Sequence, residues 1–349
     1  MKDKQLQCND SQHKTFIIAE VAQAHDGSLG TAYAFINAVS ETGADAIKFQ
    51  MHFADSESTI DEPWRIKFSP QDETRYEYWK RMEFSEKQWE ELFKHARAKG
   101  LKIICSPFSL RAVELLKKFD IDIWKIASGE ATNLHMINQI TDSKRPVIIS
   151  TGMSPIEETD ALVNLLYSNN VPCCLTQCTS KYPCPPEFLG LNMIQEYKER
   201  YKDKNISVGL SDHSGNIYSG LAAVTLGADL LEVHVTFSKK AFGPDVSSSI
   251  TIEELTSLCQ GVRFIEKAIN SSINKNVVSD GLFDLRQIFM KSIVANHNLK
   301  SGTIITNNDI DFKKPGTGLL YNDLNKILGK KLLKDVQKNN QIKMDDIIL

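Results

Sequence analysis

Eight short apolar runs recur along the first three quarters of the chain, and a helical pattern separates each run from the next. The runs cover 15–21, 44–51, 102–108, 121–128, 146–151, 173–179, 205–211 and 230–236. Buried strands that alternate with helices form a closed barrel or an open, doubly wound sheet. Eight repeats over about 255 residues have the length and rhythm of the barrel. We therefore predict an α/β fold, a (β/α)8 TIM barrel, with the open sheet as the alternative.

The regular repeat stops near residue 270, which predicts how the chain is divided. Residues 1–14 are expected to be a polar N-terminal tail, 15–270 the TIM-barrel catalytic domain, and 271–290 a linker. Short β-like runs and glycine turns predict a small β-rich domain over 291–349. An insertion at about 52–84, rich in charged and aromatic residues, interrupts the barrel pattern after its second run.

Composition excludes several classes of partner. The 41 lysines and arginines nearly balance 44 acidic residues, and no basic block occurs, so nucleic acid is not expected as a partner. No apolar run approaches the roughly 20 residues of a membrane span, and the polar N-terminus lacks the core of a signal peptide. The seven cysteines are odd in number and contain no CxxC pair. We expect a cytoplasmic protein with reduced, mostly buried thiols and no membrane association.

Polar side chains stand at or just after the end of every apolar run, where a barrel of this kind carries its active site. They are Glu20, Lys48, Gln50, Ser106, Lys125, Ser128, Ser150, Thr179, Ser211, His213 and His234. His213 and His234 follow the seventh run and end the eighth, and imidazole is a common metal ligand. They are either ligands of a divalent metal or hydrogen-bonded structural histidines.

The remaining strand-end residues suggest an anionic substrate. Lys48 and Lys125 lie within apolar runs, and each is an anion clamp, a Schiff-base lysine or a snorkelling lysine at a strand end. The serine hydroxyls suit phosphate oxygens, although any single serine can also cap a helix. Glu20 is a general base, a group near the metal or a structural acid. The residues alone predict a barrel mouth that binds a phosphate-bearing substrate beside a divalent metal.

Nine motifs, in order over nearly the whole chain, resemble those of the sialic acid (N-acetylneuraminate) synthase family. They are IIAEVAQAHDGSLG (17–30), GADAIKFQ (43–50), SPFS (106–109), WKIASGE (124–130), ISTGMS (149–154), QCTSKYP (177–183), GLSDHSG (209–215), EVHVTF with FGPD (232–245) and KKPGTG (313–318). Residues 291–349 resemble the SAF, or antifreeze-like, domain that ends these enzymes. The resemblance implies a transferase that condenses phosphoenolpyruvate with an N-acylated hexosamine, giving a nonulosonic acid and phosphate.

The resemblance also implies roles for individual residues. His213 and His234 would bind the metal, most often Mn²⁺, with Mg²⁺ or Co²⁺ as alternatives, and Glu20 would lie near the metal and the reacting carbons. Phosphoenolpyruvate would be held by Lys48, Ser106, Lys125, Ser128, Ser150, Ser180 and Ser211. The sugar would be faced by Gln50, Phe108, Glu130, Tyr182 and Asp245. Lys314 replaces an arginine that the family's SAF domain supplies to the partner subunit, which implies a domain-swapped homodimer.

Three further departures from the family pattern leave the acceptor sugar open. Ala24, beside Gln23, stands where an asparagine is usual, Val233 stands where a lysine is usual, and the 52–84 insertion is longer and more aromatic than expected. The acceptor is either N-acetylmannosamine or a 2,4-diacetamido-2,4,6-trideoxyhexose, the latter leading to legionaminic or pseudaminic acid. Two other function classes stay open, a Schiff-base aldolase on the same barrel and a binding protein that works through its antifreeze-like tail.

Overall fold

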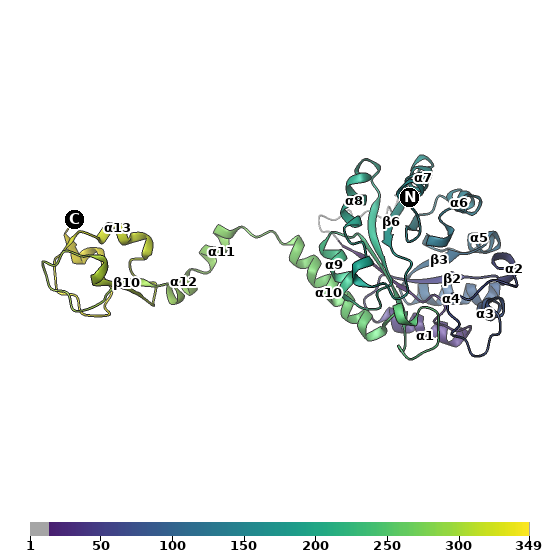
Figure 1. The fold of residues 1–349 in the computed structure, drawn as a ribbon, viewed down its shortest axis with the longest axis horizontal. Helices are drawn as coiled ribbons and strands as arrows, with labels where there is room; N and C mark the ends of the chain where they lie inside the picture. Colours follow the sequence, from purple (N-terminus) through teal and green to yellow (C-terminus); the bar gives the residue numbers. More distant parts are fainter. Residues whose placement is uncertain (1–13, 349) are drawn as a thin grey trace. The chain divides into compact units, whose positions relative to one another are not determined.

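The computed structural model describes residues 14–348, and its larger unit is built on eight parallel strands (Figure 1). They are β1 (Phe16–Glu20), β2 (Ala46–Met51), β3 (Lys102–Pro107), β4 (Ile123–Ile126), β5 (Val147–Ser150), β6 (Cys173–Cys178), β7 (Ser207–Asp212) and β8 (Leu230–Thr236). Strand β8 pairs back onto β1, from Phe16 with Leu230 to Glu20 with His234. This pairing closes the sheet, confirms the TIM barrel and excludes the open sheet. A short strand, β9 (Ile250–Thr251), extends the pairing beside β8.

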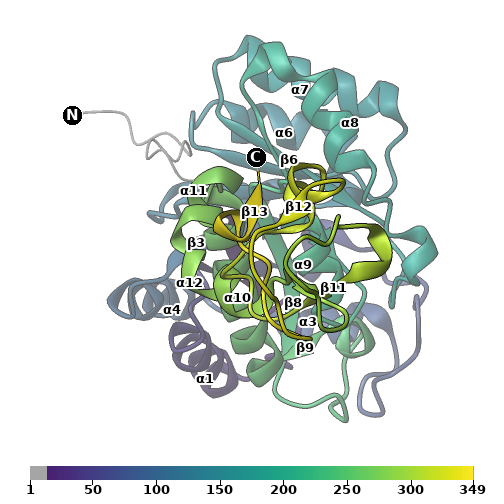
Figure 2. The same cartoon turned by 90° about the vertical axis from the view of Figure 1, so that its left-hand side faces the viewer.

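One helix follows each barrel strand and lies on the outside of the barrel (Figure 1 and Figure 2). They are α1 (Leu29–Ser40), α4 (Glu86–Ala98), α5 (Leu110–Lys117), α6 (Leu134–Thr141), α7 (Ile156–Ser168), α8 (Met193–Arg200), α9 (Tyr218–Thr225) and α10 (Ile252–Asn270). Local sequence sets their ends. Ser109 caps α5 by accepting a hydrogen bond from the Ala112 N–H. Gly100 takes a φ of 82° just after α4, a left-handed conformation that terminates a helix at low cost.

The inside of the barrel has an apolar layer and, two residues further along each strand, a polar layer. The apolar layer is a separate cluster of Ile18, Ala46, Ile104, Ile123, Ile148, Cys174 and Leu230. Side chains alternate along a strand, so the next inward residue lies two positions on. Those residues are Glu20, Lys48, Ser106, Lys125, Ser150, Thr176 and Glu232. The apolar layer therefore closes one end of the barrel beneath a buried polar layer.

The 52–84 insertion folds as an ordered part of the larger unit, with two short helices, α2 (Ala54–Glu57) and α3 (Arg75–Met82). Thr74 and Glu77 form a capping box at the start of α3. The ring of Phe68 lies edge-on to that of Tyr78, with centroids 5.0 Å apart, which gives the insertion an aromatic core of its own.

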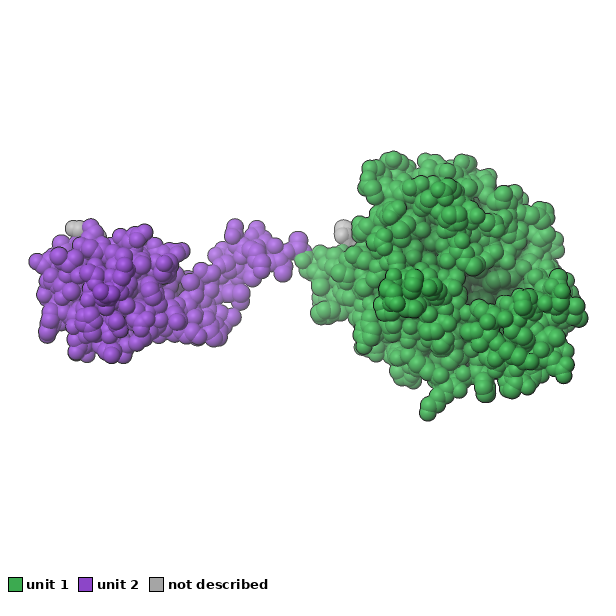
Figure 3. Space-filling model, in the orientation of Figure 1, with its two compact units in different colours: residues 1–271 green, residues 272–349 purple. Residues whose placement is uncertain are grey.

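Residues 272–349 form a second compact unit (Figure 3). It contains α11 (Lys275–Gly281), α12 (Phe283–Phe289), β10 (Ser292–Ala295), β11 (Ile310–Lys313), α13 (Leu324–Ile327), β12 (Lys331–Leu332) and β13 (Ile347–Ile348). Antiparallel pairs β10–β11 and β12–β13 surround a core separate from that of the barrel, so the predicted small β-rich C-terminal fold is confirmed. The segment predicted as a linker, 271–290, carries α11 and α12. The predicted tail, 1–14, lies outside the described residues except for Lys14.

Two further expectations can be compared with the structure. The six cysteines within the described part of the chain are free and buried, as predicted, whereas Cys8 lies outside it. Between residues 14 and 348, no helix combines the length and the apolar character that crossing a bilayer requires.

Candidate active site

A pocket of about 430 Å³ opens at the carboxyl ends of the barrel strands, and its outer wall comes from the 52–84 insertion. Of the residues predicted from sequence, it brings together Lys48, Gln50, Phe108, Lys125, Ser128, Glu130, Ser150, Ser180, Tyr182, Ser211, His213, His234 and Asp245. Glu20 and Ser106 are fully buried in the polar layer of the barrel. Lys314 belongs to the second unit, where its ammonium lies 5.2 Å from the centroid of the Phe289 ring.

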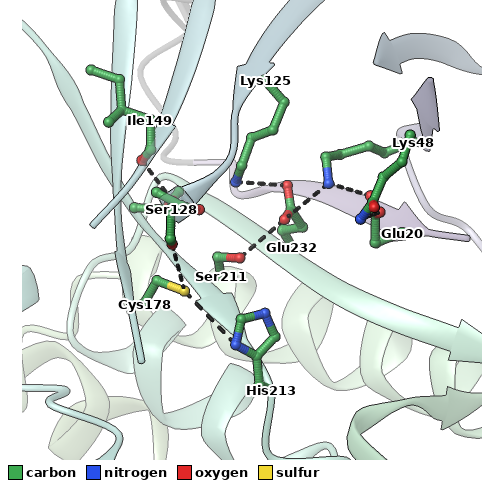
Figure 4. A network of polar contacts seen from close by, with 12 residues as sticks. Glu20, Lys48, Lys125, Ser128, Ile149, Cys178, Ser211, His213 and Glu232 are labelled. Carbon is green, nitrogen blue, oxygen red and sulfur yellow. Dashed lines mark hydrogen bonds and ion pairs between the residues drawn. The ribbon is translucent and has the colours of Figure 1, made fainter. Parts of the chain in front are cut away.

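Four buried charges form a chain of ion pairs inside the barrel, from Glu20 through Lys48 and Glu232 to Lys125 (Figure 4). The Lys48 ammonium pairs with Glu20 and lies 3.4 Å from Glu232 Oε1. Lys125 Nζ donates to Glu232 Oε2 at 2.9 Å, and Ser211 Oγ donates to Glu232 Oε1 at 3.0 Å. Two ammonium groups and two carboxylates balance, which is the condition for holding charges in a barrel interior.

Burial and pairing move the pKa values of this network in different directions. Burial raises the pKa of Glu20, and the attraction of Lys48 does not cancel that effect. Burial also acts to raise the pKa of Glu232, but Lys125 and Lys48 outweigh it and hold that pKa well below the usual range. For Lys48, burial acts to lower the pKa, and the two carboxylates outweigh it and raise it. Lys48 is thus held as an ammonium, which disfavours a Schiff-base role, and Glu20 is the carboxyl that most readily takes a proton.

The polar ends of three side chains crowd against the backbone of Gly152 near this network. A Cβ atom at Gly152 would lie 2.4 Å from Ser180 Oγ, 2.7 Å from Ser128 Oγ and 2.9 Å from Cys178 Sγ. The Gly152 N–H donates to Ser128 Oγ at 3.0 Å. Buried Ser106 Oγ has no hydrogen-bond partner within residues 14–348. Hydroxyl groups gathered in this way suit the oxygens of a phosphate or carboxylate in the adjoining pocket, which Ser128 and Ser180 line.

His213 and His234 face each other above the polar layer, with ring centroids 5.2 Å apart. His213 Nδ1 lies 3.0 Å from the Thr179 carbonyl oxygen, so an Nδ1–H donates there and Nε2 is left for another partner. Burial lowers the pKa of His234 to about 3, which keeps its imidazole neutral. For His213, burial acts to lower the pKa, but Cys178 and the Thr179 carbonyl outweigh it and raise it to about 9. Tyr182 stacks on His213 with centroids 4.2 Å apart.

The two imidazoles fit one kind of metal site. Within the described chain, no group of three histidine, cysteine or acidic side chains is arranged to hold a metal. A closed structural zinc site, which takes four protein ligands, is therefore not formed there. The lone pair of His234, and that of His213 once its Nε2 proton is lost, fit an ion that keeps most of its positions for solvent or substrate, as a catalytic ion does.

Sequence reasoning missed several residues of the site. Glu232 lies between the two lysines, and strand alternation from His234 would have placed it inside the barrel. Gly152 comes directly after the fifth apolar run, 146–151, which is a usable signal. His52 stacks between Trp79 and Phe108, with centroid distances of 4.3 and 4.5 Å, and no periodic signal marks it.

The departures from the family pattern differ in where they lie. Val233 packs in the core outside the barrel, and Ala24 packs against the same core, so neither lines the pocket. Gln23 does line it and donates to Gln50 Oε1 at 2.6 Å, while Gln50 Nε2 donates to Glu20 Oε1 at 2.7 Å. The 52–84 insertion is the departure that shapes the pocket most.

Comparison with known proteins gives matches over both units. The NeuB family profile matches residues 35–274, and the SAF domain profile matches residues 291–348. An N,N'-diacetyllegionaminic acid synthase from Campylobacter jejuni is 33% identical over 95% of this chain and 99% of its own. The N-acetylneuraminate-9-phosphate synthase of Homo sapiens is 32% identical over 97% of this chain and 93% of its own. The crystal structure of the N-acetylneuraminic acid synthetase from Leptospira borgpetersenii serovar Hardjo-bovis, in complex with citrate, superimposes with a TM-score of 0.67. It shares 27% identity over 78% of this chain and 91% of that one.

Proposed function

Because this chain belongs to the NeuB family, we propose that it is a synthase that condenses phosphoenolpyruvate with an N-acylated hexosamine. The products would be a nonulosonic acid and inorganic phosphate. The relatives carry the names of legionaminic, pseudaminic and N-acetylneuraminate-9-phosphate synthases, which all denote products of this type. The acceptor would be N-acetylmannosamine or a 2,4-diacetamido-2,4,6-trideoxyhexose.

The network of Lys48, Lys125 and Glu232, with the hydroxyls gathered around Gly152, is the observation that carries this proposal. Phosphoenolpyruvate bears a carboxylate and a phosphate, and both need cations and hydrogen-bond donors in a site withdrawn from water. Both ammonium groups are paired with Glu20 and Glu232, so a proton taken up by Glu20 would leave one net positive charge for the substrate, and the hydroxyls of Ser128, Ser180 and their neighbours supply the donors.

The chemistry would form one carbon–carbon bond and break one carbon–oxygen bond. C3 of phosphoenolpyruvate attacks the aldehyde carbon of the open-chain sugar, and the aldehyde oxygen becomes a hydroxyl. Water adds at C2 and gives up a proton, and the C2–O bond to phosphate then breaks to leave the 2-keto acid. Glu20 is our candidate for taking the proton of that water, since burial raises its pKa and pairing places it beside His234. The barrel supplies the orientation that two substrates lack in solution.

His213 and His234 would hold a divalent metal, which we propose to be Mn²⁺, with Mg²⁺ or Co²⁺ as alternatives. When bound there, such an ion supplies Lewis acidity to a carbonyl oxygen. The Thr179 carbonyl fixes the tautomer of His213, and Tyr182 fixes the plane of its ring, so both would hold the ligand in position.

We also propose that the enzyme is a homodimer in which the C-terminal domain of one copy serves the barrel of the other. Five apolar side chains of α11, α12 and the residues before them are 57–67% exposed within the single chain, which is costly in water unless a partner covers them. The residues are Ile273, Val277, Phe283, Ile288 and Phe289. Sedimentation velocity tests the dimer, and a fully active monomer would exclude it.

The direct test of the function is a phosphate-release assay with phosphoenolpyruvate and Mn²⁺ over a panel of acylated hexosamines. We expect release that requires both the sugar and the metal and stops with a chelator. Release without sugar, or none with any member of the panel, would contradict the proposal. Borohydride trapping with a carbonyl substrate is the control for the aldolase alternative, since only a Schiff base would leave an adduct on Lys48 or Lys125. Activity confined to an isolated C-terminal domain would favour the binding-protein alternative.

A further inference from the structure

The outer wall of the pocket, built by the 52–84 insertion, has no part in the chemistry above. It contributes two arginines, Arg65 and Arg75, two glutamates, Glu57 and Glu62, and several apolar and aromatic side chains. The reacting groups lie on the barrel floor and at the strand ends. A wall further out can therefore contact only the part of the acceptor that is remote from its aldehyde.

Each arginine of this wall is already paired with a carboxylate. Arg65 Nη2 donates to Asp245 Oδ1 at 2.7 Å and to the Pro244 carbonyl at 2.8 Å. Arg75 Nη1 lies 3.1 Å from Glu62 Oε1. Both guanidinium charges are therefore already balanced and do not favour the binding of a further anion.

Two other carboxylates of the pocket face no lysine or arginine among the described residues. Glu57 Oε1 lies 2.8 Å from His52 Nδ1, and Glu130 Oε2 accepts from Asn133 Nδ2 at 2.9 Å. With Glu62 and Asp245, the outer pocket has four carboxylates against two guanidinium groups. This excess of negative charge disfavours a phosphate group on the remote end of the acceptor.

Arg65 is held in a fixed position with donors to spare. Its guanidinium carbon lies 4.2 Å from the centroid of the Tyr182 ring, which stacks on His213. Both of its hydrogen bonds use Nη2, so Nε and Nη1 keep their N–H groups free of hydrogen bonds to the described part of the chain. Neutral oxygens of a sugar hydroxyl or an acyl amide suit those donors, and the neighbouring rings of Trp64 and Trp79 offer apolar surface to C–H and methyl groups.

We propose that the 52–84 insertion forms the subsite for the remote end of the acceptor and selects an uncharged acylated hexosamine over its phosphate ester, with Arg65 as the principal donor. This inference rests on the proposed function and specifies its substrate. The choice between an uncharged and a phosphorylated acceptor arises for this chain because one relative is named for a 9-phosphorylated product.

The test compares N-acetylmannosamine with its 6-phosphate on the full-length enzyme, both as acceptors and, by calorimetry without phosphoenolpyruvate, as ligands. We expect kcat/KM to be at least tenfold higher for the uncharged sugar, and its binding to be tighter. An equal or better phosphate ester overturns the inference and leaves the proposed function standing. If neither sugar turns over, the proposed function is left with a 2,4-diacetamido-2,4,6-trideoxyhexose as its acceptor, and binding alone decides on the subsite. Tighter binding of the uncharged sugar then supports the subsite. Tighter binding of the ester, equal binding of the two sugars, or no binding of either overturns it.

Two variants locate the effect. Arg65→Gln should raise KM for the sugar about tenfold while KM for phosphoenolpyruvate stays unchanged. Arg200→Gln is the matched control, because Arg200 pairs with Asp160 and is 40% exposed against 37% for Arg65, yet lies outside the pocket. Glu62→Gln frees Arg75 and should reduce the preference for the uncharged sugar several-fold. Equal KM effects of Arg65→Gln on both substrates, or an unchanged preference in Glu62→Gln, would overturn the assignment.

Discussion

Replacing Glu232 by glutamine keeps the shape of the side chain and removes one negative charge from the barrel interior. Glu232 is 3% exposed and contacts Lys125 Nζ at 2.9 Å and Lys48 Nζ at 3.4 Å. In the wild type, two ammonium groups balance two carboxylates. The variant leaves Glu20 as the sole carboxylate of the network for both lysines, so one positive charge is buried without balance.

The cost follows from those contacts. With an effective dielectric constant of about 20, each ammonium–carboxylate contact contributes about 5 kcal/mol of Coulomb attraction, most of which offsets desolvation. Removing one partner forfeits that attraction while both lysines stay buried, and comparable losses cost about 3–5 kcal/mol. For a unit of this size we expect a fall in the melting temperature of about 6–20 °C.

Tryptophan fluorescence is the assay, because all four tryptophans lie in the barrel unit: Trp64, Trp79, Trp89 and Trp124. The matched control is Glu199→Gln, which breaks a surface pair with Lys202 that has a similar contact, 2.6 Å, but side chains that are 60–76% exposed. We expect a loss of under about 1 kcal/mol for the control. Phosphoenolpyruvate should raise the melting temperature of Glu232→Gln more than that of the wild type, since its negative charge balances the freed lysines.

If Glu232→Gln loses no more folding stability than Glu199→Gln, the reasoning is refuted. It would mean that the lysines reach water or other partners in the folded protein, and that the network does not hold them. If Glu232→Gln loses the expected stability but phosphoenolpyruvate stabilises it no more than the wild type, the structural role of the network stands. The lysines would then not be the site that binds the anion.

Three other perturbations test the rest of the site. His213→Ala and His234→Ala should each abolish Mn²⁺-dependent phosphate release and weaken Mn²⁺ binding in calorimetry while the fold persists; unchanged metal binding in both would end the metal hypothesis. Gly152→Ala places a methyl group 2.4 Å from Ser180 Oγ, so phosphoenolpyruvate affinity should fall at least tenfold with KM for the sugar little changed; unchanged affinity would move the anion elsewhere. Deleting 291–349 should leave a folded barrel, since its core is separate, but should severely weaken use of the sugar; full activity would exclude a role of that domain at the acceptor.

The sequence by itself determined the architecture and much of the site's chemistry. Eight apolar runs separated by helical patterns specify a barrel because each run must be buried on both faces, and only helices on the outside can cover one of them. Polar residues at the ends of those runs then have to meet at one mouth. Strand alternation also predicts that Glu232 points into the barrel, because it lies two residues before His234 on the same strand.

Tertiary structure decided which of these groups touch. Closure of β8 onto β1 sets Glu20 beside His234, residues that are far apart in the chain, and the same closure brings Glu232 to both lysines. Those contacts depend on strand register around the whole barrel, which local sequence does not encode.

The outer pocket was also beyond the sequence. The 52–84 insertion has no regular period, so nothing in it marks Arg65 as a residue of the pocket, and only its packing places that guanidinium over Tyr182. The same packing separates the departures from the family pattern, because Val233 turns into the outer core while the insertion lines the pocket. Periodic strands report their inward and outward faces in sequence, whereas an aperiodic insertion acquires its contacts only when it folds against the barrel.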